Sequence, residues 1–249
     1  MADAPLHKAQ SHLCALVTGS GKRIGNAISR YLAQRGYDVA LHYNRSGTEA
    51  EELHGQLKAS YPARTFPLVQ FDLEDWQNVA TIFDLLPAGF GRVSLLVNNA
   101  SVFFPQTLSQ TGGKDVMRNF SVHFFAPFML MQEFHKRHGG GLVVNLLDTR
   151  IVSNEFSHAA YLLSKKTLAE LTKMAAFEWA PHTRVNGIAP GPVLPAVGAA
   201  GKNFAKVIAG SPLSEAVDVA EITETIGYFL HCPHITGQIV HVDSGSHLT

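Results

Sequence analysis

The stretch Thr18-Gly19-Ser20-Gly21-Lys22-Arg23-Ile24-Gly25 decides how this chain folds. It follows an apolar run of strand length, Leu13–Val17, and precedes apolar residues at helical spacing that end at Gly36. Small residues at such a turn let backbone N–H groups approach a pyrophosphate at the positive end of a helix. An ordinary glycine turn has a similar composition, but the position between a strand and an amphipathic helix favours a dinucleotide-binding turn.

Strand-length apolar runs alternate with helix-period segments along the chain. The predicted strands are Leu13–Val17, Asp38–Tyr43, Phe66–Phe71, Val93–Val97, Leu142–Leu147, Arg184–Ile188 and Gln238–Val242. The predicted helices are one from Ile24 to Gly36, then Glu49–Leu57, Asp75–Leu86, Asp115–His135, His158–Trp179 and, after a Pro/Gly-rich loop, Asp218–Leu230. Continuous apolar strands separated by helices indicate a parallel sheet covered on both faces. We therefore predict one α/β domain over residues 1–249, doubly wound with about seven strands, in which residues 1–12 form a frayed start.

Composition restricts the class of protein. The 20 Lys+Arg balance the 20 Asp+Glu, so no excess charge points to nucleic acid or to an anionic membrane surface. No apolar run reaches the roughly 18 residues of a membrane span, and the first residues lack an apolar signal core. Cys14 and Cys232 cannot staple a secreted fold and are interpreted as small buried residues in a reducing compartment. We therefore expect a cytoplasmic globular protein with neither nucleic-acid nor membrane partners.

The 13 histidines raise the question of a metal site. No pair has the HExxH spacing of a zinc-binding helix, and no cysteine supports them. No metal site is therefore predicted.

The end of the second strand indicates which dinucleotide is bound. An NAD-type site places an acidic residue there for the ribose 2′-hydroxyl. This chain has Tyr43-Asn44-Arg45-Ser46, whose guanidinium and hydroxyl groups can hold a 2′-phosphate that a carboxylate would repel. The sequence predicts NADPH, unless Arg45 is merely a solvated loop charge. Arg23 can pair with a phosphate or with a polar substrate, and Asp72 can accept the adenine amino group or cap a helix.

A tyrosine and a lysine supply candidate acid–base chemistry. Tyr161 and Lys165 are four residues apart and share one helix face. A free phenol has a pKa near 10, and a nearby ammonium favours the phenolate, so we expect Tyr161 to exchange a proton near neutral pH. Such a pair also arises by chance on helix surfaces, but the dinucleotide turn upstream makes it specific. Lys165 can also hydrogen-bond the nicotinamide ribose.

These residues resemble the short-chain dehydrogenase/reductase family over nearly the whole chain. The matching pieces are TGSGKRIG, Asn98-Asn99-Ala100, YLLSK, Asn186-Gly187 with Pro190-Gly191, and Gly237 with Val242-Asp243. The resemblance implies a Rossmann sheet, commonly assembled into tetramers, so a homotetramer is expected. It also implies that the asparagine-alanine turn supports the cofactor and that the Pro-Gly loop lies by the nicotinamide.

Two positions depart from the usual family pattern. Asp148 stands where a serine usually precedes the tyrosine by 13 residues, and His123 stands where the helix usually has asparagine. Asp148 resembles the pteridine reductase and dihydromonapterin reductase branch, as do the residues of 22–25, 42–46 and 98–105. A carboxylate opposes phenolate formation at Tyr161, the reverse of the effect of Lys165, and it accepts the N–H donors of a pterin well. Asp148 is otherwise a strand-end turn residue, and His123 is interpreted as a hydrogen-bonded, partly buried histidine.

The resemblance assigns roles residue by residue. Asp148, Tyr161 and Lys165 are the expected catalytic residues. The expected cofactor-binding residues are Gly19, Lys22, Arg23, Ile24, Gly25, Tyr43, Asn44, Arg45, Ser46, Asp72, Leu73, Asn99, Ala100, Ser101, Tyr161, Lys165, Pro190 and Gly191. The expected substrate-binding residues are Arg23, Ser101, Phe103, Asp148, Tyr161, Pro192 and Leu194, with the Phe103 ring stacked on a flat pterin.

The predicted function is NADPH-dependent reduction of a pterin, such as dihydrobiopterin or dihydromonapterin, or of dihydrofolate, to the tetrahydro form. One alternative is a general short-chain reductase that acts on a small ketone or alcohol. Another is an NADP-binding regulator without turnover, against which the Tyr161/Lys165 pair argues. The small, apolar loop of residues 192–201 is consistent with a mobile lid but does not distinguish biopterin, monapterin and folate tails.

Overall fold

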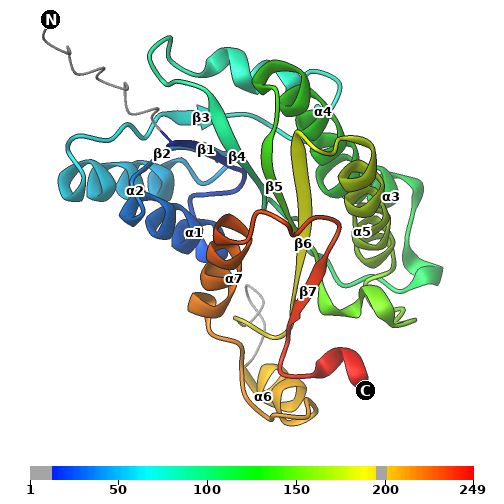
Figure 1. Ribbon diagram of the computed structural model, residues 1–249. Coiled ribbons are helices and arrows are strands. Elements are labelled where there is room, and N and C mark those ends of the chain that lie inside the picture. Colours follow the sequence, from blue (N-terminus) through cyan, green and yellow to red (C-terminus); the bar gives the residue numbers. More distant parts are fainter. Residues whose placement is uncertain (1–12, 195–200) are drawn as a thin grey trace, which may run out of the picture.

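Seven parallel strands form the sheet of this protein. The computed structural model describes residues 13–194 and 201–249, and its strands lie in the order β3-β2-β1-β4-β5-β6-β7 (Figure 1). The strands are β1 (Leu13–Val17), β2 (Tyr37–Tyr43), β3 (Leu68–Gln70), β4 (Val93–Asn98), β5 (Gly141–Leu146), β6 (Thr183–Pro190) and β7 (Ile239–Val242). Strand order reverses between β1 and β4, so a crevice opens beyond their carboxyl ends. The doubly wound parallel sheet predicted from the sequence is confirmed.

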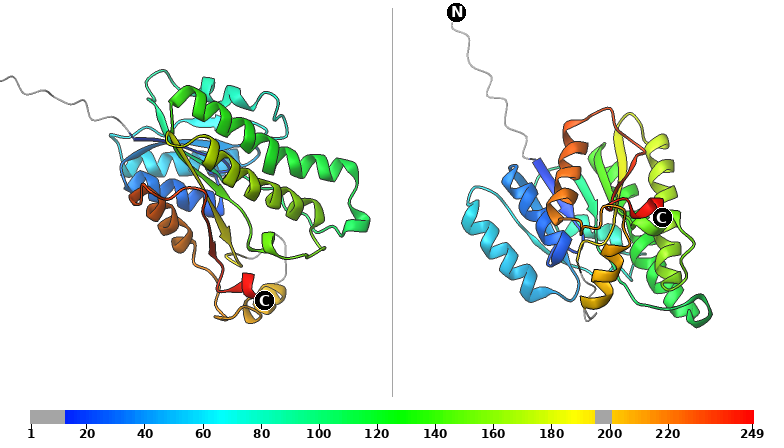
Figure 2. Two further views of the ribbon diagram at one scale, coloured as in Figure 1. Left: turned by 45° about the vertical axis from the view of Figure 1, so that its right-hand side comes forward. Right: turned by 90° about the horizontal axis from the view of Figure 1, so that it is seen from below.

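Helices cover both faces of the sheet (Figures 1 and 2). One face carries α1 (Arg23–Gln34), α2 (Gly47–Ser60) and α7 (Val219–His231), and the other carries α3 (Gly113–Phe120), α4 (Ala126–His138) and α5 (Ala159–Glu178). Helix α6 (Gly201–Ala209) lies beyond the carboxyl edge of the strands, near the 3-10 turn Ser246–Leu248 (Figure 1).

The two layers of helices explain why the strands are apolar throughout. Along β1, Cys14 and Leu16 enter the core under α4, whereas Ala15 and Val17 enter the core under α1. Side chains of a strand alternate between its two faces, and here both faces are buried. The core therefore consists of two apolar layers, one on each side of the sheet.

Two predicted helices differ from the observed ones. Residues 115–135 do not form one α-helix, because a π-helical turn, Ser121–Phe125, separates α3 from α4. Pro127 has no N–H to continue an α-helical ladder, and the Ala126 N–H bonds back to the Ser121 carbonyl instead. Residues 75–86 contain a 3-10 helix, Val79–Leu85, rather than an α-helix. There the Thr81 hydroxyl donates to the Asn78 carbonyl at 2.7 Å, a local bond that competes with regular helix bonding.

Other expectations concern the loops and the N-terminus. The sequence did not predict α6, whose residues 201–209 follow the Pro/Gly-rich loop directly. The expected frayed start, residues 1–12, and residues 195–200 of the expected lid lie outside the described residues. None of the described helices is long and apolar enough to span a membrane.

Candidate active site

A cleft of ≈ 480 Å³ opens where the strand order reverses. It is lined by most of the residues predicted to bind a dinucleotide, namely Gly19, Lys22, Arg23, Ile24, Gly25, Tyr43, Asn44, Arg45, Ser46, Asp72, Leu73, Asn99, Ala100 and Ser101. The sequence did not predict five other lining residues, which are His42, Glu74, Val102, Arg118 and Val122. The β1–α1, β2–α2, β3 and β4 ends thus meet around one space, as the parallel topology requires.

The turn between β1 and α1 is packed too closely for side chains. Gly19 has a φ of +65°, and a Cβ there would lie 2.8 Å from the Ala100 Cα. A Cβ on Gly25 would collide with the Gly19 carbonyl and would lie 2.5 Å from the Asn99 amide nitrogen. Within the part of the chain that the structure describes, no side chain caps the N-terminus of α1 at Lys22, so its first N–H groups are not satisfied by a cap. This backbone is suited to an anion such as a pyrophosphate.

His42 of β2 is hydrogen-bonded to the turn between β1 and α1. Its Nδ1 accepts the Gly19 N–H at 3.1 Å, which places the ring proton on Nε2, 3.1 Å from the Phe71 carbonyl. Burial lowers the pKa of His42 to about 4, although the bond to Phe71 opposes the shift. The imidazole is therefore neutral around pH 7 and acts as a fixed hydrogen-bonding group. A histidine directly after the apolar residues 39–41 of β2 was the sequence signal for this role.

The carboxyl end of β2 has no acidic residue between Tyr43 and Ser46. Arg45 is exposed there and faces the cleft. Lys22 pairs with Glu49 of α2 at 2.6 Å, across the same opening. This side of the cleft therefore offers cations where an NAD-type site would offer a carboxylate.

The opposite wall begins at Asp72, after β3. The Asp72 Oδ1 accepts the Glu74 N–H at 3.0 Å, so this carboxyl caps a turn and retains a second oxygen for other donors. Glu74 pairs with Arg118 of α3 at 2.8 Å, and the Arg118 guanidinium lies 4.7 Å from the Phe104 ring centroid. Arg118 thus connects Glu74, on this wall of the cleft, with Phe104 in the segment that follows β4.

A second cluster of predicted residues surrounds Tyr161 on α5. The Tyr161 hydroxyl donates to the Asp148 Oδ2 at 2.9 Å. The Arg150 guanidinium grips the same carboxylate with Nε–Oδ1 and Nη2–Oδ2 distances of 3.0 and 2.9 Å, and its backbone N–H adds a third bond at 2.9 Å. Arg150 also pairs with Glu155 at 3.0 Å. The sequence placed Asp148 beside Tyr161 correctly but missed Arg150.

The electrostatics of this cluster keep the Tyr161 phenol protonated. Burial, together with the charge and hydrogen bond of Asp148, raises the pKa of Tyr161 well above its ordinary value, while Arg150 acts in the opposite direction. Burial also opposes ionisation of Asp148, but Arg150 outweighs it and lowers the pKa of that carboxyl. Asp148 thus opposes ionisation of Tyr161, the direction of effect expected of a carboxylate at this position. Tyr161 is a neutral phenol bonded to a carboxylate.

Lys165 is buried one helical turn beyond Tyr161. Its Nζ donates to the Leu146 carbonyl at 2.5 Å and lies 5.9 Å from the centroid of the Tyr161 ring. Burial lowers the pKa of Lys165 to about 8, against the attraction of Asp148. The ammonium is therefore close to its titration range rather than permanently charged.

His123, in the π-helical turn, connects the cleft with α5. Its Nε2 accepts the Val102 N–H at 3.0 Å and lies 3.1 Å from the Ser101 hydroxyl. The ring proton is therefore on Nδ1, 2.9 Å from the Ser164 hydroxyl, which in turn donates to the Tyr161 carbonyl at 2.6 Å. Burial and the nearby Lys165 lower the pKa of His123 well below its usual value. His123 is a buried hydrogen-bonded residue that positions its neighbours, as interpreted from the sequence.

Phe103 lies at the mouth of the second cluster. Its ring is stacked on His158 at 4.3 Å between centroids and meets the Tyr161 ring edge-on at 4.9 Å. The side chain is 40% exposed, so part of its surface remains accessible. An aromatic surface thus stands directly beside the phenol and the carboxylate, and His158 was not foreseen as its support.

The remaining predicted residues lie on the β6 side of the site. Pro190 ends β6, and the Gly191 N–H donates to the Val242 carbonyl of β7 at 2.9 Å. The Pro192 carbonyl accepts the Val217 N–H at 3.1 Å. The Arg23 guanidinium donates to the Leu194 carbonyl at 3.2 Å and thereby connects the cleft to this loop.

Comparisons with known proteins agree with this geometry. A family model described as enoyl-(acyl carrier protein) reductase matches residues 19–247. Pteridine reductase 1 of Leishmania tarentolae is 31% identical, and the match covers 94% of this chain and 96% of that protein. The chain belongs to the short-chain dehydrogenase/reductase family. It is therefore an oxidoreductase of this family, and the resemblance inferred from its sequence is confirmed.

Solved structures and other relatives extend the comparison. FolM alternative dihydrofolate reductase 1 from Brucella suis, solved in complex with NADP, is 35% identical with a TM-score of 0.90 and covers 96% of each chain. The 3-oxoacyl-[acyl-carrier-protein] reductase FabG of Staphylococcus epidermidis is 27% identical over 94% of this chain and 98% of that protein. The more similar of these proteins fit the pteridine reductase branch of the family.

Proposed function

We propose that this protein uses NADPH to reduce a pterin, such as dihydrobiopterin or dihydromonapterin, or dihydrofolate, to the tetrahydro form. The observation that carries the proposal is the carboxylate of Asp148, held ionised by Arg150 and bonded to Tyr161 beside the half-exposed Phe103 ring. A flat heterocycle with N–H donors at its edge matches an aromatic surface next to a hydrogen-bond acceptor. The similarity to a pteridine reductase and to an alternative dihydrofolate reductase supports the same substrate class.

The cleft fits NADPH by the chemistry of its residues. The uncapped α1 N-terminus and the glycines at 19 and 25 suit the pyrophosphate, and Arg45 with Ser46 suits the 2′-phosphate. Three neighbouring structures carry this cofactor as NADP or NADPH. The chemistry that NADPH supplies when bound is a hydride for a ring carbon.

The residues of the second cluster then supply the proton. Tyr161 holds its proton at neutral pH and can deliver it, directly or through a water molecule, to the ring nitrogen next to that carbon. Hydride and proton together add two hydrogens across one C=N bond of the pterin. Loss of the proton leaves a phenolate next to Asp148, which Arg150 and Lys165 offset by their positive charge. Ser101 and Arg23, which line the cleft, are proposed to bind the polar edge of the ring.

A second candidate is reduction of a small ketone, supported by the similarity to FabG. A ketone substrate gains little from a carboxylate at 148, because a carbonyl oxygen needs a donor rather than an acceptor. The two candidates therefore differ in what happens when Asp148 is replaced by serine, a neutral donor.

The test compares NADPH consumption with dihydrobiopterin, dihydromonapterin, dihydrofolate and a β-ketoester. We expect turnover of at least one pterin substrate and a loss of about 10²–10⁴-fold in Asp148→Ala and Asp148→Ser, because proton delivery through Tyr161 loses its partner. Asp84→Asn, in an exposed surface pair with Arg137, is the matched control and should leave turnover unchanged. Turnover of the ketoester alone, preserved in Asp148→Ser, would contradict the pterin assignment.

Phe103 provides an independent test of stacking. Aromatic stacking contributes about 0.5–1.5 kcal/mol beyond area burial, so Phe103→Ala should raise KM for the pterin up to about tenfold. Phe104→Ala is the control, because that neighbouring ring packs under Arg118 instead. Equal KM values for the two variants would count against a pterin stacked on Phe103.

We also propose a homotetramer in the cytoplasm. Helix α5 exposes Leu163, Met174 and Phe177 at 50%, 67% and 90%, and their spacing places them on one face. An apolar stripe on a helix surface suits packing against a second copy. Light scattering should give four chains for the wild type and a smaller assembly for Phe177→Lys, with Glu52→Lys, an exposed position on α2, as a control that also introduces a lysine.

A further inference from the structure

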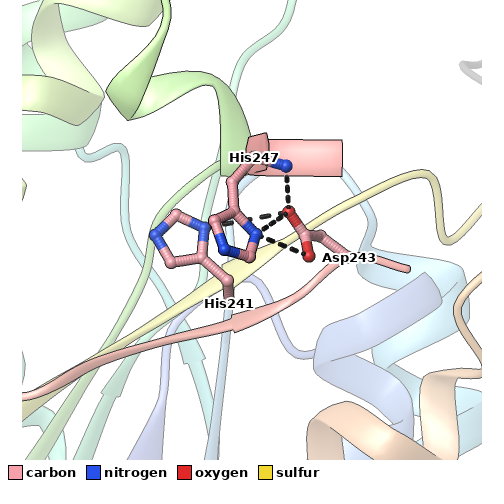
Figure 3. Close-up of side chains that lie close together, drawn as sticks. All are labelled: His241, Asp243 and His247. Carbon is pink, nitrogen blue, oxygen red and sulfur yellow. Dashed lines mark hydrogen bonds and ion pairs between the residues drawn. The ribbon is translucent and has the colours of Figure 1, made fainter. Parts of the chain in front are cut away.

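Three potential metal ligands meet behind the catalytic cluster, at the end of β7 (Figure 3). His241 and Asp243 are two residues apart and point to the same side of the extended chain. His247 comes from the 3-10 turn that follows, four residues after Asp243. One ligand atom from each residue lies within 4.8 Å of the others.

The distances between these atoms suit one small ion. A tetrahedral zinc site with bonds of about 2.0–2.2 Å separates its ligand atoms by roughly 3.3–3.6 Å. The Asp243 Oδ2 lies 2.9 Å from the His247 Nδ1 and 3.8 Å from the His241 Nδ1, values on either side of that separation. The two imidazole rings are stacked with centroids 4.3 Å apart and planes inclined by 29°. Small side-chain rotations therefore bring the three atoms around one centre.

The hydrogen bonds of Asp243 account for only part of this arrangement. Its carboxylate accepts the backbone N–H groups of Gly245 and His247 at 3.1 and 2.8 Å, and also the Thr149 hydroxyl. These bonds explain why the turn forms. They do not explain the His241 Nδ1, which is buried and has no hydrogen-bond partner among the described residues although it faces the carboxylate. An unpaired buried nitrogen is costly, and a metal ion would satisfy it.

We propose that His241, Asp243 and His247 bind one divalent transition-metal ion of the zinc type. Two imidazole nitrogens and one carboxylate oxygen are a donor set for such ions rather than for Mg²⁺ or Ca²⁺. The Thr149 hydroxyl holds the carboxylate in place, as a supporting donor behind a metal ligand does. Binding moves the His247 ring proton from Nδ1, which lies 2.9 Å from the Asp243 Oδ2, to Nε2.

This site departs from the sequence expectation of no metal, which rested on HExxH spacing and on cysteines. It also has a structural consequence, because Thr149 directly follows Asp148. The ion would fasten the C-terminal turn to β7 on the side where Thr149 anchors the catalytic segment. We therefore assign it a structural rather than a catalytic role.

The test uses the full chain with any affinity tag removed, because a histidine tag binds the same metals. Zinc is titrated calorimetrically, and cobalt is added as a spectroscopic probe whose visible bands report on coordination. We expect one tightly bound ion per chain and a cobalt spectrum of low coordination number. Loss of a residue that hydrogen-bonds a metal ligand costs about 10–100-fold in metal affinity. Loss of the ligand itself costs more, so His241→Gln and His247→Gln should each weaken zinc binding by at least about 100-fold.

The control is His182→Gln. His182 is exposed and precedes β6, so it lies at the amino end of the strands, whereas the cluster lies at the carboxyl end of β7. This variant should bind zinc as the wild type does, and circular dichroism checks that all three variants are folded. The proposal is overturned if the wild type binds no zinc at millimolar concentration. It is also overturned if His241→Gln and His247→Gln, both folded, bind as tightly as the control, or if the cobalt spectrum does not change in them.

Discussion

Replacement of Arg150 by methionine tests how the Asp148 carboxylate is held. The substitution keeps a long apolar side chain but removes both guanidinium bonds to Asp148, at 2.9 and 3.0 Å. Breaking a buried ion pair costs about 3–5 kcal/mol. The Arg150 and Asp148 side chains are 29% and 13% exposed, so water screens part of the pair, and the backbone N–H bond to Asp148 remains. We therefore expect a loss of about 2–3 kcal/mol in the free energy of unfolding at neutral pH.

The effect should depend on pH with a defined sign. Arg150 lowers the pKa of Asp148 in the folded wild type, so the pair stabilises the protein above the ordinary carboxyl range and loses this effect as the pH falls through the lowered pKa. In the variant, burial acts without the guanidinium and raises the pKa of Asp148. Its carboxyl then becomes neutral at a higher pH, which relieves the unpaired charge. The stability difference between variant and wild type should therefore be larger at pH 8 than at pH 5.

Urea denaturation and thermal unfolding measure both effects. At about 2–4 °C per kcal/mol for a chain of this size, the melting temperature should fall by about 4–12 °C at neutral pH. Arg137→Met is the matched control, because Arg137 pairs with Asp84 and Glu133 at the surface, where such pairs contribute at most about 1 kcal/mol. Equal losses in the two variants, or a loss in Arg150→Met that is the same at pH 5 and pH 8, would refute this account of Asp148.

Three further predictions concern other parts of the site. Arg45→Asp should reduce kcat/KM for NADPH about 10–100-fold and leave NADH nearly unaffected, because hydrogen bonds to charged groups contribute about 1.5–3 kcal/mol; steady-state kinetics with both cofactors checks this. His42→Leu leaves the Gly19 N–H without its acceptor, so the free energy of unfolding at pH 8 should fall by about 1–3 kcal/mol, and fluorescence titration should show weaker NADPH binding. Because folding lowers the pKa of His42 to about 4, the unfolded imidazole is protonated first as the pH falls, so the stability difference between wild type and variant should shrink from pH 8 to pH 6. His123→Leu removes the acceptor of the Val102 N–H and should lower kcat more than it changes the KM for NADPH. Phe120→Leu is the control, and an equal fall in kcat in that variant would indicate general destabilisation.

The sheet was predictable from the sequence because its strands are uniformly apolar. β1 begins and ends where the apolar run does, and the other strands differ by a few residues at their ends. The dinucleotide cleft followed from one glycine-rich turn, since the parallel topology brings the ends of β1, β2 and β4 together. Local periodicity could not reveal the π-helical turn, because the apolar spacing continues through it and only Pro127 signals the change.

Contacts between side chains were less accessible. Asp148 and Arg150 are separated by one residue, and only the turn after β5 brings the guanidinium onto the carboxylate. The balance between Lys165 and Asp148 at Tyr161 depends on their distances and on the pairing of Asp148, which cannot be read from a four-residue spacing. The His241–His247 segment contains two histidines and an aspartate at strand and turn spacing, but no common motif marks it.

The position of the C-terminal turn has a practical consequence for handling the protein. The Asp243 carboxylate accepts a hydrogen bond from the Thr149 hydroxyl. The last described residue, Thr249, lies only two positions beyond His247. A fusion partner or a surface linker attached after Thr249 would therefore pull on the segment that anchors the neighbour of Asp148. Leu13, in contrast, begins β1 at the amino ends of the parallel strands, away from the carboxyl ends that line the cleft, so immobilisation through the N-terminal side should leave activity undisturbed (Figure 1).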